Sequence, residues 1–302
     1  MSESAMTRRQ GAAWLLTAML APLAHASGLG WTNLALYAAA ALPLWLLPGK
    51  MDGLPKPILL LEWGSVILAG ASILPASGSY WPGRASEQVV PAVLLILAAM
   101  TGNVRRGANA AGILCWMTGI LGAIVLYMGT QGIELRWLRP VPVVWNPVLA
   151  GTMLLPGLSV LWPEKPGKSM CGIAVLAAVL GVLVQGTLGA EAAEMLSAPF
   201  YEMARSLRLG SLSRLEPVGS VMLTLSWFAL CLYLVMGART LLEEAGIGEQ
   251  KALWTGTVAM CLLIGMKETT KLPAQPLWSG ILWFGIPLWN FFKKAKKDEK
   301  RC

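Results

Sequence analysis

The sequence predicts an all-α integral membrane protein that forms a single polytopic domain over residues 1–302 and crosses the bilayer ten times. Hydrophobic residues make up 56% of the chain and charged residues only 13%, about half the charged fraction of an average soluble domain. Apolar runs of roughly 20 residues, the length that crosses a bilayer as a helix, recur from one end of the chain to the other. These runs leave only short loops and tails, so there is no room for a separate globular domain.

The length of each apolar run places the expected helices. The fourth and ninth are the shortest, and the sixth is irregular because it contains several prolines. A basic tail, 293–302, follows the last helix and is typical of a cytoplasmic anchor. The ten expected helices cover residues 10–28, 31–48, 57–76, 88–102, 107–129, 141–162, 170–190, 218–238, 252–267 and 276–292.

The distribution of basic residues predicts the orientation. Of the 24 lysines and arginines, 16 fall on the side that holds both tails and 8 on the other. Because cytoplasmic loops carry the excess of positive charge, both termini are expected in the cytoplasm, which requires an even number of spans. A competing interpretation is a cleaved signal peptide, since Arg8 and Arg9 precede an apolar stretch that ends in an A-x-A pattern at Ala24 to Ala26.

Prolines single out the sixth and the first expected helices. Pro142, Pro147 and Pro156 all lie within 141–162. Proline has no backbone N–H, so an unbroken α-helix through this range would lose hydrogen bonds. Pro22 lies near the middle of the first helix, where a simple kink is the alternative. Backbone groups freed in this way at membrane depth must be buried in protein or line a cavity.

Interrupted helices five positions apart in a chain of ten have the spacing of two inverted five-helix repeats. The repeats would cover about residues 8–130 and 141–292. In such folds a small ligand binds near the midplane, with its carboxylate at the N–H groups of a half-helix and its ammonium group at unwound carbonyls. The expected ligand-binding residues are Thr17, Ala21, Pro22, Gly151, Thr152, Pro156 and Gly157.

Charged residues offer a few candidates for coupling or gating. Glu62 lies within the third expected helix and is the clearest candidate for an intramembrane carboxylate; the alternative places it at the headgroups beside Lys56. The segment 189–217 is the longest outer loop and contains an amphipathic stretch. It is expected to be a gate, a partner surface or a solvated interfacial helix. Its gating candidates are Glu202, Arg205, Arg214 and Glu216.

Catalytic chemistry has little support in the sequence. His25 is the single histidine, and the five cysteines are scattered without metal-ligand spacing. Neither a phosphate-binding glycine loop nor a GxSxG motif is present. The sequence therefore predicts a protein that is not an enzyme and that uses no cofactor, no metal and no nucleic acid.

Two stretches of the chain resemble one known family. The longer stretch, Ala198–Leu234, is similar to the segment before and within the eighth helix of the spore germination permeases, the B subunits of germinant receptors. Glu134–Val141 is similar to the family's approach to its broken sixth helix, and Arg9 with Gln10 gives a weaker match at the first helix. The matching positions of the longer stretch are Pro199, Glu202, Arg205, Gly210, Arg214, Leu215, Glu216 and Trp227.

This resemblance implies a fold of the amino acid/polyamine/organocation permease superfamily, with ten helices, of which the first and sixth are broken. It implies a permease-like receptor subunit in the inner membrane of a bacterial spore. Such a subunit would bind an amino acid or similar small nutrient and act with an A subunit and a lipoprotein C subunit. Binding would signal germination by shifting the population between two packings of the repeats.

Two other functions stay open. A secondary amino-acid transporter could use the same scaffold, and a proton-coupled carrier would need a titratable group near the midplane. A ligand-free assembly subunit is the third possibility. Leucine, methionine and tryptophan side chains filling the space between the first and sixth helices would favour the assembly subunit.

Overall fold

The computed structural model describes residues 8–46, 54–81, 83, 85–158, 171–207, 216–266 and 279–285, and these residues are helical apart from their connections. The first half contains α1 (Arg8–Ala26), α2 (Trp31–Leu46), α3 (Lys56–Ile73), α4 (Ser86–Met100) and α5 (Val104–Gln131). The second half contains α6 (Pro147–Leu154), α7 (Cys171–Leu188), α8 (Ala190–Met195), α9 (Pro199–Ser206), α10 (Glu216–Glu244) and α11 (Glu249–Gly265). Short 3-10 turns follow three of these helices: η1 (Ser27–Leu29), η2 (Leu74–Gly78) and η4 (Leu155–Gly157). A further 3-10 turn, η3 (Leu135–Trp137), precedes α6, and a π-helical turn covers Ile281–Gly285.

Five of the described segments are long and apolar enough to cross a membrane. They are Arg9–Leu29, Lys56–Gly78, Val104–Gln131, Cys171–Leu188 and Glu216–Glu244. The protein is therefore an all-helical membrane protein. The apolar helices α4 and α6 are shorter, and the tenth expected helix lies mostly outside the described residues.

The outer surface of the bundle is apolar, as lipid contact requires. On α5, Ile113, Trp116 and Tyr127 are 64%, 78% and 65% exposed. Val175 on α7 and Leu262 on α11 are 62% and 64% exposed. Exposed apolar residues in such numbers would be an aggregation hazard on a soluble monomer, whereas lipid tails accept them.

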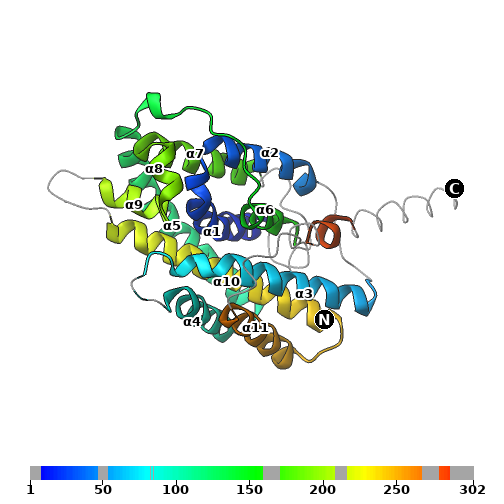
Figure 1. Ribbon diagram of the computed structural model, residues 1–302. Coiled ribbons are helices and arrows are strands. Elements are labelled where there is room, and N and C mark those ends of the chain that lie inside the picture. The colour runs from blue at the N-terminus through cyan, green and yellow to red at the C-terminus, as the bar shows by residue number, and fades with distance from the viewer. Residues whose placement is uncertain are drawn as a thin grey trace.

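The helix α10 is the central element of the bundle. In Figure 1 it runs between α4 and α11 on one side and α1 and α5 on the other, and it packs against all four as well as against α3 and α9. The middle of α10, from Ala229 to Ala238, is buried at every position. A membrane helix that is buried all round is covered by other helices and not by lipid.

The first helix differs from the sequence expectation. An interruption at Pro22 was expected, but α1 continues through Pro22 to Ala26, and the regular helix ends only at η1. The prediction of a broken first helix is therefore wrong. Pro22 lies in the last turns of α1, where its missing N–H removes a single bond to the carbonyl four residues earlier, and packing against α10 holds this region.

The sixth helix is short because its approach is extended. The helix expected over 141–162 begins only at Pro147, and it passes into the 3-10 turn η4 at Leu155. Leu158 then leaves the helical region with a ψ of 82°. The regular helix therefore ends well before residue 162, and the second half of the expected broken helix, 159–162, lies outside the described residues.

Polar side chains of α2 hold the extended approach to α6. The Thr32 hydroxyl bonds the backbone of Val141 at 3.1 Å, and the Asn33 amide bonds the carbonyl of Pro142 at 3.1 Å and the N–H of Val144 at 3.0 Å. The Tyr37 hydroxyl donates to the Val144 carbonyl at 3.1 Å. These side chains take the place of the intrahelical hydrogen bonds that the prolines remove.

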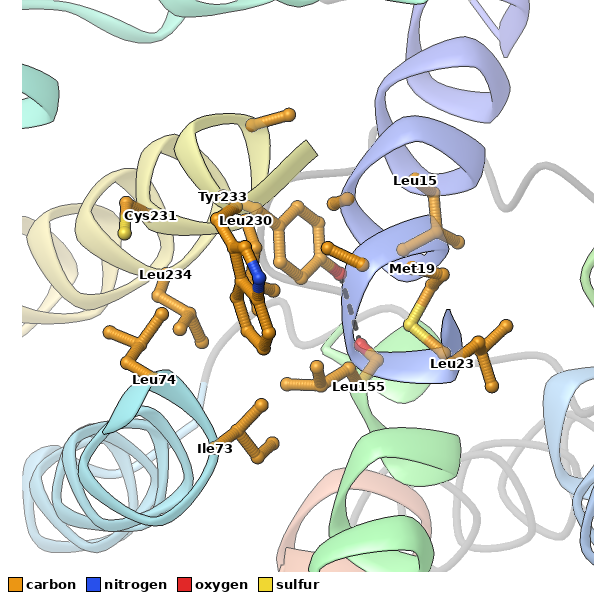
Figure 2. Packing of buried hydrophobic residues seen from close by; sticks show 14 of the residues in the cluster. Leu15, Met19, Leu23, Ile73, Leu74, Leu155, Leu230, Cys231, Tyr233 and Leu234 are labelled. Carbon is orange, nitrogen blue, oxygen red and sulfur yellow. Dashed lines mark hydrogen bonds between the residues drawn. The ribbon is translucent and has the colours of Figure 1, made fainter. Parts of the chain in front are cut away.

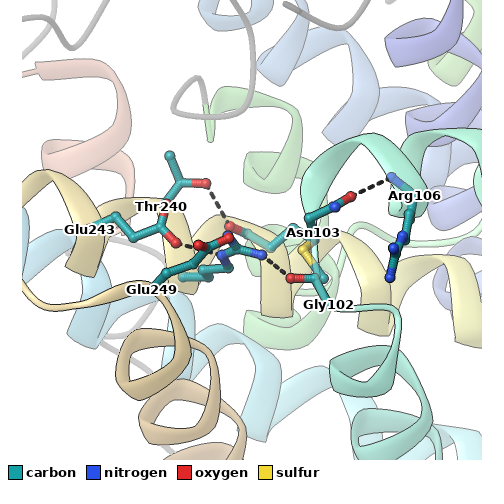
Figure 3. A network of polar contacts seen from close by, with 8 residues as sticks. Gly102, Asn103, Arg106, Thr240, Glu243 and Glu249 are labelled. Atoms are coloured by element: carbon teal, nitrogen blue, oxygen red, sulfur yellow. Dashed lines mark hydrogen bonds and ion pairs between the residues drawn. The ribbon is translucent and has the colours of Figure 1, made fainter. Parts of the chain in front are cut away.

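A buried arginine ties the helix ends at the opposite end of α10 from α9. The side chain of Arg239 is 5% exposed and pairs with Glu243 at 2.5 Å and with Glu249 at the start of α11. It also donates to the carbonyl of Gly102 in the α4–α5 turn. Figure 3 shows this cluster, in which Asn103 caps α5 by accepting from the N–H of Arg106 at 2.8 Å. One side chain thus links α10, α11 and the turn before α5.

We expect Arg239→Met to lower the free energy of unfolding by about 2 to 3 kcal/mol, because it removes a buried charged donor that bonds three groups at once. Arg136→Met is the matched control, since Arg136 is 71% exposed and pairs with Glu134 at 2.5 Å. That exposed pair should contribute less than about 1 kcal/mol. Unfolding in mixed micelles measures both, and equal losses would contradict the structural role given to Arg239.

Candidate functional site

The middle of α1 is bonded to α10 through one hydroxyl. The Ser226 hydroxyl accepts from the Ala21 N–H at 2.7 Å and donates to the Thr17 carbonyl at 2.5 Å. These two backbone groups lie one turn before Pro22. Trp14, two turns before Pro22, donates its indole N–H to the Ala229 carbonyl at 2.9 Å. The helix is therefore fastened to α10 on both sides of its middle.

Helix α10 also supplies the side chain that bonds the backbone at the end of α6. The Tyr233 hydroxyl lies 3.1 Å from the carbonyl oxygens of both Leu155 and Leu158. Figure 2 shows Tyr233 pointing at Leu155, with Leu15, Met19, Leu23 and Leu230 around it. The Tyr233 ring also meets Trp14 edge-on, with ring centroids 6.0 Å apart. The carbonyls freed at this interruption are thus satisfied by protein.

The seven residues expected to bind ligand are brought near this junction, and all of them are buried. The hydroxyls of Thr17 and Thr152 bond carbonyls of their own helices, those of Ala13 and Val148, at 2.8 Å. Leucine, methionine and aromatic side chains fill the space around them. Pro22 is the member of the set that borders a polar pocket, and Thr17 borders an apolar groove between α1, α5 and α7.

The polar pocket lies where α1 ends and α6 begins. It has a volume of about 430 Å³, within the range of roughly 300–1,000 Å³ that is usual for small-molecule sites. Its walls come from the end of α1 with η1, from η2, from the start of α4, from the start of α6 and from the segment that ends α8. The polar residues that line it are His25, Ser72, Ser79, Glu87, Asn146, Glu194 and Ser197.

The inner limit of the pocket is the packed core. Ile73, Leu149 and Trp227 all line the pocket and are at most 1% exposed. They belong to the same apolar cluster that fills the junction between α1, α6 and α10. The pocket is therefore open at one end of the bundle and closed toward its middle.

Several polar groups of the pocket keep hydrogen-bonding capacity for a ligand. Ser72 and Ser79 donate their hydroxyl protons to carbonyls three residues earlier, at 2.9 and 2.8 Å, so their oxygens can still accept. The Asn146 side-chain oxygen accepts from the N–H of Leu149 at 2.9 Å and caps α6, which leaves its two amide N–H groups. The pocket thus combines donors and acceptors around an apolar floor.

Glu62 is fully buried within the protein. Its exposed fraction is 0%, whereas Lys56 at the start of α3 is exposed. Neither carboxylate oxygen of Glu62 has a hydrogen-bond partner among the described residues, and the indole N–H of the adjacent Trp63 is also unpartnered there. A buried carboxyl group without a partner is costly in free energy, so Glu62 is a candidate for proton or cation binding in the interior.

The expected gating residues form a cluster between α9 and the start of α10. Arg205 lies 3.5 Å from Glu202 and 4.0 Å from Glu216, and the Tyr201 hydroxyl donates to Glu216. The hydrogen bond to this carboxylate raises the pKa of Tyr201, because a phenolate there would face a negative charge. Arg214 lies outside the described residues. The cluster fixes α9 to α10 beside the pocket.

The sequence interpretation missed most of the polar residues that the structure puts to use. Ser226, Tyr233, Asn33 and Tyr37 belong to no recognisable motif. His25 stands out in the sequence only as the single histidine, and it lines the pocket. The available signal was the set of polar side chains on the eighth expected helix, the helix that meets both proline-bearing helices.

No known family model matches the chain, and no curated protein matches it at a significant level.

We expect Ser226→Ala to lower the free energy of unfolding by about 1 to 3 kcal/mol, because two buried backbone groups of α1 lose their partner. Thr240→Ala is the matched control on the same helix. The Thr240 hydroxyl bonds the Met236 carbonyl of α10 itself, at 2.9 Å, so this change should stay within about 0.5 kcal/mol. Equal effects in thermal unfolding would show that the bridge to α1 is unimportant.

Proposed function

We propose that the protein senses a small nutrient, an amino acid or a similar metabolite, in the pocket at the ends of α1 and α6. The single observation that carries this proposal is the pocket itself. It is lined by polar residues and has a volume of about 430 Å³. It is open at one end of the bundle, and the packed core closes it toward the middle of the bundle. A site with this shape can hold a ligand without giving it a path through the bundle. This favours sensing over transport.

In this proposal the chain is a ten-helix bundle of two inverted five-helix repeats with both termini in the cytoplasm. Two observations support this arrangement. Five segments are long and apolar enough to cross a membrane, and α6 gives way to a 3-10 turn at Leu155, near the place where such repeats have a break. The first helix, α1, has no interruption and so departs from the pattern of such inverted repeats.

By its resemblance, the protein would be the permease-like subunit of a spore germinant receptor in the spore inner membrane. It would act with an A subunit and a lipoprotein C subunit. The cluster of Tyr201, Glu202, Arg205 and Glu216 supports this role, because it belongs to the stretch on which the resemblance rests and it lies next to the pocket. Ligand contacts that draw η2 and the start of α4 toward η1 and α6 would shift the population between two packings, and the partner subunits would respond to that shift.

The alternative function is a secondary amino-acid transporter, and the observation that favours it is Glu62. A buried carboxyl group without a partner is the kind of group that a proton-coupled carrier needs. The third possibility is a ligand-free assembly subunit. It is favoured by the filled space between α1 and α6, where Trp14, Met19 and Leu155 are all 0% exposed. The filled space has no room for a ligand, whereas the pocket at the ends of α1 and α6 does.

The test of ligand binding is a thermal-shift panel of the twenty amino acids, common sugars and nucleosides with the purified protein. A ligand at about a hundred times its Kd should stabilise the folded state by about 2.7 kcal/mol. Ser79→Trp should abolish the shift because the side chain would fill the pocket. Ser206→Trp is the control, since Ser206 lies on the exposed side of α9 and its hydroxyl also bonds only a carbonyl three residues earlier.

The test between sensing and transport uses the ligand found in that panel. We expect no uptake of the labelled ligand into vesicles that contain the protein alone, and loss of the germination response to it when the gene is deleted. Uptake that Glu62→Gln abolishes would instead establish the transporter. A panel without any stabilising ligand would favour the assembly subunit.

A further inference from the structure

The charged groups of the pocket are all acidic. Among the described residues that line it, Glu87 at the start of α4 and Glu194 in α8 carry charge, and neither lysine nor arginine is present. Both carboxylates are on exposed residues, and neither makes an ion pair with a described residue. A concave site lined by charge of one sign raises the local concentration of ions of the opposite sign.

Several helix ends around the pocket also favour cations. Three helical segments finish there: α1 with η1, α3 with η2, and α8. The carbonyl end of a helix carries a partial negative charge, which favours cations. The amino ends of α4 and α6 also face the pocket and carry the opposite partial charge. Glu87 lies in the first turn of α4, and Asn146 already accepts from one of the first N–H groups of α6.

The floor of the pocket carries no charge that would repel an ammonium group. It is formed by apolar and aromatic residues such as Ile73, Leu149 and Trp227, which are at most 1% exposed. The serine oxygens near it accept hydrogen bonds and give no positive charge. A ligand carboxylate would find amide and hydroxyl donors in the described pocket but no cationic side chain with which to pair.

We propose that the pocket selects organic cations, ammonium compounds with little or no compensating negative charge, over zwitterions, and that it excludes anions. The inference rests on the proposed function in one respect, that this pocket is the ligand site. It narrows the ligand class from small nutrients in general to amines, including basic amino acids and their amides. It also replaces the midplane site for a zwitterion that the sequence suggested.

Three four-carbon compounds of matched length test the selectivity: 1,4-diaminobutane, 4-aminobutanoate and butanedioate. Binding to the full-length protein in nanodiscs is measured by calorimetry at pH 8, above the range in which imidazole groups ordinarily titrate. The diamine should bind at least about tenfold more tightly than the zwitterion, a difference within reach of two carboxylates in a concave site, and the dianion should not bind. Increasing the salt concentration should weaken the binding of the diamine.

The variant Glu87→Gln with Glu194→Gln should bring the affinity of the diamine to within about threefold of that of the zwitterion, because it removes both charges and keeps the shape. Glu191→Gln is the control. Glu191 is an exposed residue of the same helix as Glu194 and does not line the pocket, so the selectivity should be unchanged. Selectivity that survives the double substitution would overturn the inference.

The inference and the proposed function fail in different ways. If the zwitterion or the dianion binds as tightly as the diamine, cation selectivity is wrong and the ligand site stands. Cation selectivity is also wrong, and the ligand site stands, if none of the three compounds binds while a neutral or anionic compound of the nutrient panel stabilises the protein and Ser79→Trp abolishes that effect. If neither panel contains a compound that binds, the ligand site itself is wrong.

Discussion

The structure depends on one constraint: polar backbone groups inside a membrane must find partners within the protein. The chain meets this constraint with side chains from helices distant in sequence. Ser226 serves α1, Tyr233 serves the end of η4, and Thr32, Asn33 and Tyr37 serve the extended approach to α6. The position of α10 at the centre follows from this, since two of these partners come from it. The pocket remains at the end of the bundle, beyond the region in which α10 makes these contacts.

Much of the helix layout could be predicted from the sequence, because apolar length alone determines where a membrane helix can lie. The bounds of α3, α4, α5, α7 and α11 fall within a few residues of the expected ranges. The effect of each proline could not be predicted in this way. The helix α1 continues through Pro22, and the hydroxyl that bonds its backbone beside Pro22 lies 205 positions away in sequence; no local pattern reports such a contact.

The candidate site was predictable only in part, for the same reason. Proline and glycine positions identify where backbone groups are released, but they do not say what satisfies them. The sequence therefore led to a ligand cradle in the middle of the membrane, whereas α10 fills that place with Ser226 and Tyr233. The adjoining pocket depends on residues such as His25, Glu87 and Glu194, which come from separate helices and share no motif.

One consequence follows from Gln185, a fully buried residue of α7. Its side-chain oxygen accepts from the N–H of Trp31 at 3.1 Å, and its amide donates to the carbonyls of Trp137 and Arg139 at 2.8 and 2.7 Å. A single amide therefore joins α7, the first turn of α2 and the extended lead into α6. Opening of the pocket is then easiest at the facing wall, η2 and the first turn of α4, because a movement there breaks none of these three hydrogen bonds.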